Sequence, residues 1–461
     1  MREIIILGSF AVCMIPMAFA QTTGPSTEQQ WKKLETLVQE NGGTVGFNAR
    51  DTEGNIILAR NDRQNFIPAS SIKLLTALAA IQLLGENYRF KSELYSTGEV
   101  VQGILQGDVY IVGGGDPSLL SKYFPDLNPI AGWVAAIKKS SIREIQGSII
   151  GVDTHFKGYP LSFGVSMEDV GNYYGCGAWG LNAFDNSVPV FLHSGEPGTT
   201  FQVITPEDFS GTNYTAQGTA EKQSSDEAFV LGMPGLFERV IEGTMPANIK
   251  GFQIDASMPD PALYLARYLT SELKKSGINV LKEAASLRDP FPSASVMADP
   301  VLSPKLSSLC EVMLRESHNL FADAIFREMS VWRAMDGTYS SAADVFKEVC
   351  GLPLRAKIMD GSGLSCQNFL CPYDFSKALH RLSTAEEFSP PRGLKVETLT
   401  NGTVLHYKTG TMRNVRAISG YINSAEKGWQ CFSIMANGFD ENGADIRRQM
   451  LAFLRAYFGG A

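Results

Sequence analysis

Hydrophobic and polar residues alternate along residues 45–60, on both sides of the polar sequence DTEGN at positions 51–55. Alternation around a polar turn predicts a β-hairpin. Residues 68–84 instead place apolar side chains at a helical spacing, with Ile72, Leu75 and Ala79 on one stripe that continues to Leu83. This spacing predicts a helix.

The C-terminal part shows the same two periodicities. They predict helices over residues 306–316, 320–329 and 446–458, and strands over 417–422 and 429–435 that are joined by a turn at 423–428. The last helix is amphipathic, and we expect it to pack on these strands rather than on a membrane.

The middle of the chain reads differently. From about residue 95 to 285, short strand-like runs are interrupted by Gly, Pro, Asn and Ser. This pattern favours mostly β domains that are inserted between two parts of an α/β domain.

The composition is that of a folded chain with several domains. At roughly 100–200 residues per domain, 461 residues make two to four domains, and 44% apolar residues suffice for a core. The net charge of −8 argues against broad electrostatic binding to nucleic acid or anionic lipid. Because no internal apolar run reaches about 18 residues, we expect no membrane span in the mature chain.

The N-terminus resembles an export signal. Met1-Arg2-Glu3 precedes an apolar run over residues 4–19, which ends in Ala18-Phe19-Ala20. This order predicts a signal peptide at residues 1–20, with a retained membrane anchor as the alternative. We therefore expect a periplasmic or other extracytoplasmic protein.

Six cysteines remain in the exported chain. Cys366 and Cys371 are close enough in sequence to pair, but the sequence does not choose among pairings, and buried free thiols are the default. The histidines are scattered, and no two C-x-x-C pairs occur. We expect neither a metal nor another cofactor.

The first candidate for catalysis is the pair Ser70 and Lys73 at the start of the predicted helix. Three residues along a helix place both side chains on one face, one turn apart. A hydroxyl becomes a good nucleophile when a base takes its proton, and a lysine whose pKa is lowered by burial or by another cation serves as that base. The helix N-terminus also offers backbone N–H groups to a developing oxyanion.

Two further motifs strengthen this interpretation. Ser317-His318-Asn319 lies between two predicted helices, and Lys408-Thr409-Gly410-Thr411 begins a strand region. The patterns S-x-x-K, S-x-N and K-T-G, in this order, are typical of penicillin-binding proteins and class A β-lactamases.

Longer segments narrow the resemblance. PASSIKLLTALAA, YIVGGGDPSL, MEDVGNYYGCGAWGLN, ESHNLFADAIF, DGSGLS, YKTGTM and SGYI resemble the D-alanyl-D-alanine carboxypeptidase/endopeptidase family, the low-molecular-mass class C penicillin-binding proteins. These segments span residues 45–422. The long separation of Ser70 from Ser317 fits this family, whose extra domains are inserted there, and is too long for a plain β-lactamase.

The resemblance implies a role for each motif residue. Ser70 would attack the carbonyl between the two terminal D-alanines of a peptidoglycan stem peptide, with Lys73 as general base and β-lactams as inhibitors. Ser317 would relay a proton to the leaving nitrogen, tuned by Lys408, and Asn319 would hold Lys73 and the substrate amide. The terminal carboxylate would be bound by the strand motif, Lys408, Thr409, Gly410 and Thr411.

The substrate's side chain gives two further expectations. In this family a carboxylate from the inserted region receives the side-chain amine, and Asp169 occupies the similar segment. Relatives usually carry Arg after GLS, near the side-chain carboxylate, where this chain has Cys366. We expect Arg413 to supply the missing cation; the alternative is a Cys366–Cys371 disulfide and a different side chain.

The expected fold is therefore an α/β penicillin-binding, serine β-lactamase-like transpeptidase domain, an antiparallel sheet flanked by helices, with two inserted, mostly β domains. The predicted boundaries are 21–92 and 286–461 for the catalytic domain, 93–165 and 252–285 for the second domain, and 166–251 for the nested third. The predicted activity is that of a serine D-Ala-D-Ala carboxypeptidase that also cuts cross-links. A serine β-lactamase and a catalytically idle peptidoglycan-binding protein are the alternatives.

Overall fold

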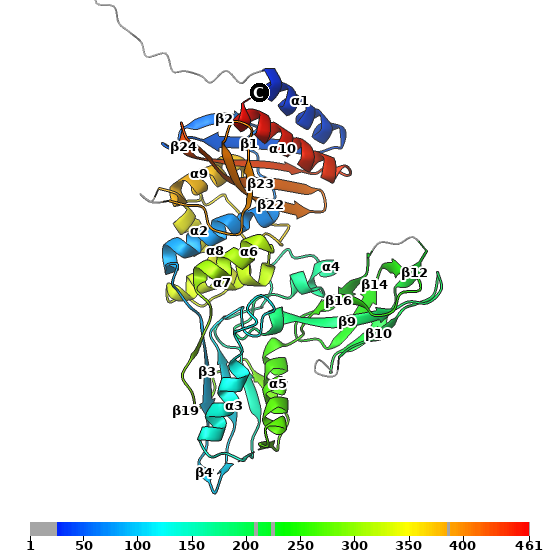
Figure 1. Cartoon of the computed structure of the whole chain (residues 1–461), viewed down its shortest axis with the longest axis vertical. Coiled ribbons are helices and arrows are strands. Elements are labelled where there is room, and N and C mark those ends of the chain that lie inside the picture. The colour runs from blue at the N-terminus through cyan, green and yellow to red at the C-terminus, as the bar shows by residue number, and fades with distance from the viewer. Residues whose placement is uncertain (1–24, 207–210, 223–225, 385–387, 461) are drawn as a thin grey trace, which may run out of the picture.

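The two ends of the chain form one antiparallel sheet of six strands in the computed structural model, which describes residues 25–206, 211–222, 226–384 and 388–460. The strand order is β2-β1-β24-β23-β22-β21. The strands are β1 (Thr44–Arg50), β2 (Ile56–Arg60), β21 (Lys395–Thr398), β22 (Val404–Met412), β23 (Val415–Ser424) and β24 (Gly428–Asn437). Because Thr44 pairs with Asn437, segments from opposite ends of the sequence share one scaffold (Figure 1).

The hairpin predicted for residues 45–60 is confirmed as β1 and β2. The two predicted C-terminal strands are also confirmed, but both are longer than expected. Pairing continues to Ser424 and Gly428, so the turn predicted at 423–428 shrinks to residues 425–427. The polar residues at the strand ends remain in the ladder because their backbone groups pair there.

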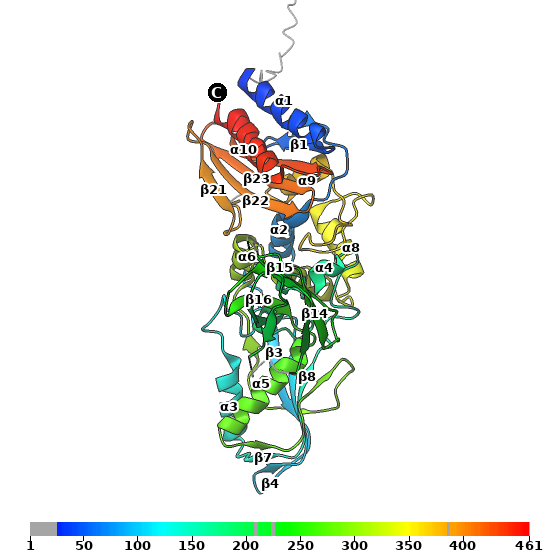
Figure 2. The same ribbon diagram turned by 90° about the vertical axis from the view of Figure 1, so that its right-hand side faces the viewer.

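Helices cover both faces of this sheet (Figures 1 and 2). On one face α1 (Pro25–Glu40) packs beside α10 (Gly443–Gly459), around buried residues such as Phe47 and Phe453. The opposite face carries the helices that hold the motifs. They are η1 (Ala69–Ser71), α2 (Ile72–Leu84), α6 (Leu306–Arg315), α7 (Asn319–Trp332), α8 (Tyr339–Cys350) and α9 (Pro372–Leu382).

Helix α2 is buried nearly all round, although the sequence predicted one apolar stripe. Lys73, Leu74 and Thr76 are as buried as the stripe residue Ile72, because α2 lies between the sheet and the other helices. The predicted stripe ends at Leu83, which is only half-buried. A helix that is apolar on every side is expected in such a central position.

The inserted region extends away from the sheet (Figure 1). Its first part contains α3 (Pro129–Lys139), α5 (Pro261–Lys275) and two sheets. The larger sheet joins β3 (Lys91–Ser96), β6 (Val109–Gly113), β8 (Ile149–Val152), β18 (Ala285–Leu287), β19 (Ser295–Val296) and β20 (Val301–Leu302). The smaller one joins β4 (Val100–Val101), β5 (Ile104–Leu105), β7 (Glu144–Ile145) and β17 (Asn279–Val280).

The second part of the insertion is built from short strands. It begins with α4 (Met167–Val170), η2 (Tyr173–Gly175) and η3 (Phe184–Asn186). The strands that follow are β9 (Ser187–His193), β10 (Gln202–Ile204), β11 (Asn213–Ala216), β12 (Thr219–Glu221), β13 (Phe229–Leu231), β14 (Glu238–Glu242), β15 (Thr244–Pro246) and β16 (Phe252–Ser257). The prediction of mostly β inserted segments thus agrees with the structure.

Strand pairing crosses two of the predicted domain boundaries. β16 begins at Phe252 and pairs with β9 of the predicted third domain, and β19 and β20 lie beyond residue 285 but pair with β3. Strands of two to six residues are too short for their hydrophobic pattern to show which other strands they pair with. Where each domain ends therefore stays a prediction.

The predicted signal peptide at residues 1–20 lies outside the described residues. Within the described ranges, no helix combines the length and the apolar character that crossing a membrane requires.

Candidate active site

Ser70 lies on a tight turn that leads into α2. Ala69, in front of it, has a φ of 46°, and Ser317 of the second motif has a φ of 57°. Both values fall in the left-handed region that side chains other than glycine seldom adopt, and such strain concentrates at functional sites. The helix predicted for residues 68–84 is confirmed, with its first turn formed as the short 3-10 helix η1.

Lys73 connects the nucleophile to two other elements. Its Nζ donates to the Oγ of Ser70 at 3.0 Å, to the Oδ1 of Asn319 at 2.6 Å and to the carbonyl of Ser362 at 2.6 Å. Burial, and then the charge of Lys408, lower the pKa of Lys73 to about 7. A lysine with this pKa is neutral often enough at physiological pH to accept a proton.

Asn319 is the first residue of α7 and bridges the catalytic helix to the insertion. Its Oδ1 accepts from Lys73, while its Nδ2 donates to the carbonyl of Tyr174 at 2.8 Å. Both hydrogen-bonding ends of the amide are therefore used, which fixes the orientation of Asn319 and of the Lys73 ammonium group.

The third motif approaches from strand β22. The Nζ of Lys408 donates to the Oγ of Ser317 at 3.0 Å, and burial, followed by the charge of Lys395, lowers the pKa of Lys408 to about 8. Gly410 lies against the nucleophile turn: a Cβ at this position would lie 2.5 Å from the carbonyl oxygen of Pro68. Only glycine allows β22 to come this close to η1.

Two buried carboxylates, which the sequence analysis did not select, support Lys73. Asp323 of α7 accepts from the backbone N–H of Gly361 at 3.1 Å and from the Oγ of Ser362 at 3.2 Å. Asp360 accepts from the N–H groups of Gly363 and Ser365 at 2.8 and 2.7 Å. They hold the DGSGLS loop, whose Ser362 carbonyl contacts Lys73. In their ionised forms they raise the pKa of Lys73 against the larger effect of burial, while burial, and next the charge of Asp360, raise the pKa of Asp323 itself to about 8.

The side chain of His318 turns into the protein. Its ring packs on Phe321 and Tyr123, and its Nε2 lies 3.7 Å from a carboxylate oxygen of Asp185. Burial, with a further contribution from Lys73, lowers its pKa to about 3, so the ring is neutral at physiological pH.

Asp169 lies in the short helix α4, half-buried, on the segment that Asn319 holds through Tyr174. Burial raises the pKa of Asp169, and a hydrogen bond with the Tyr174 side chain opposes this rise.

Arg413 is exposed, in the two-residue turn between β22 and β23. The hydroxyl of Thr411 accepts a hydrogen bond from a different cation, Arg447 of α10.

Cys366 and Cys371 do not pair. Cys366 is exposed and its Sγ donates to the carbonyl of Gly164, whereas Cys371 is buried and contacts Asp374. All six cysteines of the described chain are free thiols. Among the described residues, no group of three His, Cys, Asp or Glu side chains is placed to hold a metal ion.

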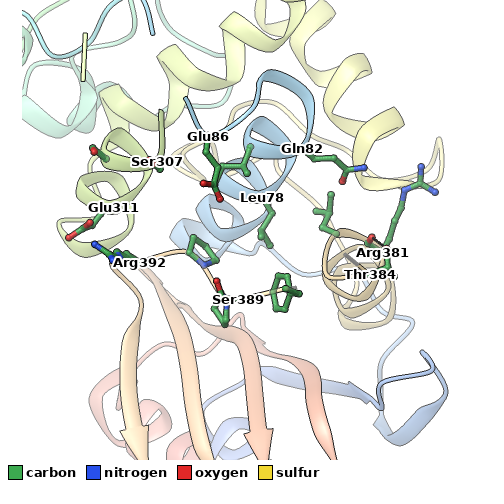
Figure 3. Close-up of a pocket in the computed structure, with 15 residues that line it drawn as sticks. Leu78, Gln82, Glu86, Ser307, Glu311, Arg381, Thr384, Ser389 and Arg392 are labelled. Atoms are coloured by element: carbon green, nitrogen blue, oxygen red, sulfur yellow. Dashed lines mark hydrogen bonds between the residues drawn. The ribbon is translucent and has the colours of Figure 1, made fainter. Parts of the chain in front are cut away.

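A cavity of about 730 Å³ lies elsewhere, between α2, α6, α9 and the segment that follows α9. Figure 3 shows Leu78, Ser307 and Arg381 on its walls, and none of the motif residues lines it. The three motifs meet at the opposite, N-terminal end of α2, so this cavity is separate from the candidate site.

A comparison with known protein families assigns the chain to one of them. The model of the D-Ala-D-Ala carboxypeptidase 3 (S13) family matches residues 30–390 and 391–457. The chain belongs to this family. The sequence-based prediction of a serine-type D-Ala-D-Ala carboxypeptidase is thereby confirmed.

Individual members of the family are distant but match along most of their length. The chain is 26% identical to the D-alanyl-D-alanine carboxypeptidase of Actinomadura sp. (strain R39), over 91% of this chain and 83% of that protein. It is 23% identical to the D-alanyl-D-alanine carboxypeptidase DacB of Haemophilus influenzae, over 86% of each.

A solved structure shares the fold. Penicillin binding protein 4 (dacB) from H. influenzae superposes with a TM-score of 0.74 at 21% identity, covering 92% of this chain and 97% of that chain. The same protein in complex with a novel β-lactam gives a TM-score of 0.71. The predicted penicillin-binding α/β fold is confirmed by this likeness.

Proposed function

We propose that the chain hydrolyses the bond between the two terminal D-alanines of peptidoglycan stem peptides, through an acyl-enzyme on Ser70. The observation that carries this assignment is the 3.0 Å contact between Ser70 and a buried lysine whose pKa is near neutrality. Such a pair forms a nucleophile and its base without histidine or metal.

In the acylation step, the Oγ of Ser70 attacks the carbonyl carbon of the penultimate D-alanine and its proton passes to the Nζ of Lys73. The oxyanion lies between the backbone N–H groups of Ser70 and Thr411. The C–N bond then breaks, and the leaving nitrogen receives a proton through the hydroxyl of Ser317, which Lys408 contacts. D-alanine departs, and water hydrolyses the ester to restore the Ser70 hydroxyl.

Substrate binding is assigned to the groups around this pair. Asn319 holds the substrate amide, and the terminal carboxylate is bound by the strand motif, Lys408, Thr409, Gly410 and Thr411. Asp169 receives the amine of the substrate's side chain. Charged hydrogen bonds from fixed donors are the strong ones for a small anionic group.

Arg413 is proposed to bind the carboxylate of the substrate's side chain. It would take over the role of the arginine that relatives carry at the position of Cys366. Its exposed turn carries no ion pair with another described residue. An Arg413→Ala variant that hydrolyses a diaminopimelate-type peptide as fast as the wild type would remove this assignment.

We further propose that residues 1–20 direct export, so that the enzyme works outside the cytoplasm on the cell wall, on free stem peptides and on cross-links. The order of charged, apolar and small residues at the N-terminus supports this location.

The test is release of D-alanine from a pentapeptide that ends in D-Ala-D-Ala, measured with a D-amino acid oxidase assay on residues 21–461. We expect release by the wild type, and none by Ser70→Ala. Rapid consumption of a chromogenic cephalosporin without release of D-alanine would instead identify a β-lactamase.

A further inference from the structure

A cation from outside the three motifs lies at the carboxylate end of the site. The Nη2 of Arg447, near the start of α10, donates to the Oγ1 of Thr411 at 2.5 Å. Thr411 is exposed and Arg447 is half-buried, so the contact faces solvent on one side. Figure 2 shows α10 beside β23, the strand that pairs with β22, and β22 carries the K-T-G-T motif.

No described carboxylate lies within ion-pair distance of Arg447. Another cation, Arg416, is close enough for Arg447 to affect its pKa, which is lowered by burial and then by the charge of Arg447. Arg416 is occupied: its guanidinium donates to the carbonyls of Met412, Val415 and Gly443. Arg447 uses one of its five N–H donors on a described residue, so several remain for an anion.

Lys408, the cation within the motif, is already engaged. Its Nζ donates to the Oγ of Ser317 and to the carbonyl of Thr409, and its side chain is buried. A lysine held in this way contributes charge to the carboxylate subsite and serves the proton relay, but it does not offer a carboxylate a planar, two-point geometry. A guanidinium is suited to that geometry and stays charged at every physiological pH.

We propose that Arg447 is a specificity-determining residue that binds, together with Thr411, the C-terminal carboxylate of the substrate and the carboxylate of β-lactams. The proposal rests on the function proposed above and adds a residue of α10 to its carboxylate subsite. Arg447 then distinguishes peptides with a free C-terminus from peptides whose C-terminus is blocked.

The test compares two pentapeptides that differ only at the C-terminus, one ending in D-Ala-D-Ala and one in its carboxamide. Both are given to the wild type, Arg447→Ala, Arg447→Lys and the matched control Arg448→Ala. Arg448 is the next residue of α10, is mostly exposed and pairs with Asp445 at 2.7 Å, away from Thr411. Thermal unfolding confirms that each variant is folded.

For the carboxylate peptide we expect Arg447→Ala to raise KM about 10- to 100-fold, the usual loss for a hydrogen bond to a charged group, with a smaller change in kcat. KM for the carboxamide stays within about twofold of the wild type, so the preference for a free carboxylate collapses. Arg447→Lys keeps the charge but loses the two-point geometry of the guanidinium. Its KM for the carboxylate peptide should lie between those of the wild type and Arg447→Ala. Arg448→Ala matches the wild type on both peptides.

Equal losses on both peptides would overturn the proposal, because they would show that Arg447 only supports the fold around Thr411. An unchanged preference in Arg447→Ala would overturn it as well. If the wild type releases neither D-alanine from the carboxylate peptide nor D-alaninamide from the carboxamide, the proposed function itself fails and the assignment of Arg447 fails with it.

Discussion

Lowering the pH below about 7 is expected to slow the acylation of Ser70 progressively, because it protonates the Lys73 base. Burial of the Lys73 side chain, and next the charge of Lys408, lower the pKa of Lys73 to about 7. Only the neutral amine accepts the proton of the Ser70 hydroxyl, so the rate follows the neutral fraction of Lys73. On the alkaline side Lys408, with a pKa of about 8, loses the charge that assists carboxylate binding.

The magnitude follows from these two pKa values. Half of Lys73 is neutral at about pH 7 and about 1% at pH 5, so acylation slows roughly 50-fold between them. A lysine with the ordinary pKa of 10.5 would be less than about 0.1% neutral at pH 7, and the rate would rise about tenfold per pH unit up to about pH 10. A maximum between about pH 7 and 8 therefore distinguishes the lowered pKa from an ordinary one.

The assay is the second-order rate constant for labelling by a fluorescent penicillin, measured from about pH 5 to 10 at constant ionic strength. Ser70→Ala serves as the control for labelling elsewhere, and circular dichroism at each pH confirms that the protein remains folded. A rate constant that is level from pH 5 to 8, or one that climbs steadily to pH 10, would refute the role of Lys73 as a base with a lowered pKa.

Three further changes test the site and its support. Gly410→Ala places a Cβ 2.5 Å from the carbonyl oxygen of Pro68, so we expect the free energy of unfolding to fall by about 1–3 kcal/mol and penicillin labelling to slow. The control Gly132→Ala adds a Cβ in open space on α3 and should have neither effect. Asn319→Ala removes both hydrogen bonds that orient the base, and labelling should slow at least tenfold while urea denaturation stays cooperative. Burial raises the pKa of Asp116 from 3.8 to about 6. At pH values between these two, the folded state therefore binds more protons than the unfolded state, and the stability of the wild type falls as the pH rises. In urea denaturation, the free energy of unfolding of Asp116→Asn relative to the wild type should rise by up to about 3 kcal/mol from pH 4 to 7. If the unfolding free energies of the two proteins change in parallel with pH, this prediction is wrong.

The catalytic motifs were accessible from the sequence because each is local. Once a helix is predicted, the spacing of three residues places Ser70 and Lys73 on the same helix face. The strand motif K-T-G-T contains both a cation and hydroxyl groups within four residues. The hairpin and the C-terminal strands were predicted because alternation is also a local property. What brings Lys408 to Ser317 is the packing of β22 against the helices, and the sequence alone showed it only through the family resemblance.

The supporting groups were missed because nothing in their immediate sequence shows that they lie beside Lys73 or Thr411. Asp323 and Asp360 are ordinary acidic residues until folding buries them beside Lys73. Arg447 follows the strand motif at a distance in sequence and meets Thr411 only because α10 packs back on the sheet. Cys366 and Cys371 are near in sequence, but one is exposed and the other buried, so closeness along the chain did not predict a disulfide.

The most direct test of the central claim is the intact mass of wild-type and Ser70→Ala protein, residues 21–461, followed over hours with benzylpenicillin. A lasting adduct of one penicillin on the wild type alone is the predicted result, since it identifies Ser70 as the nucleophile of a penicillin-binding peptidase. An adduct that disappears while the penicillin is consumed would favour a β-lactamase. An adduct on both proteins, or on neither, would contradict the assignment of Ser70.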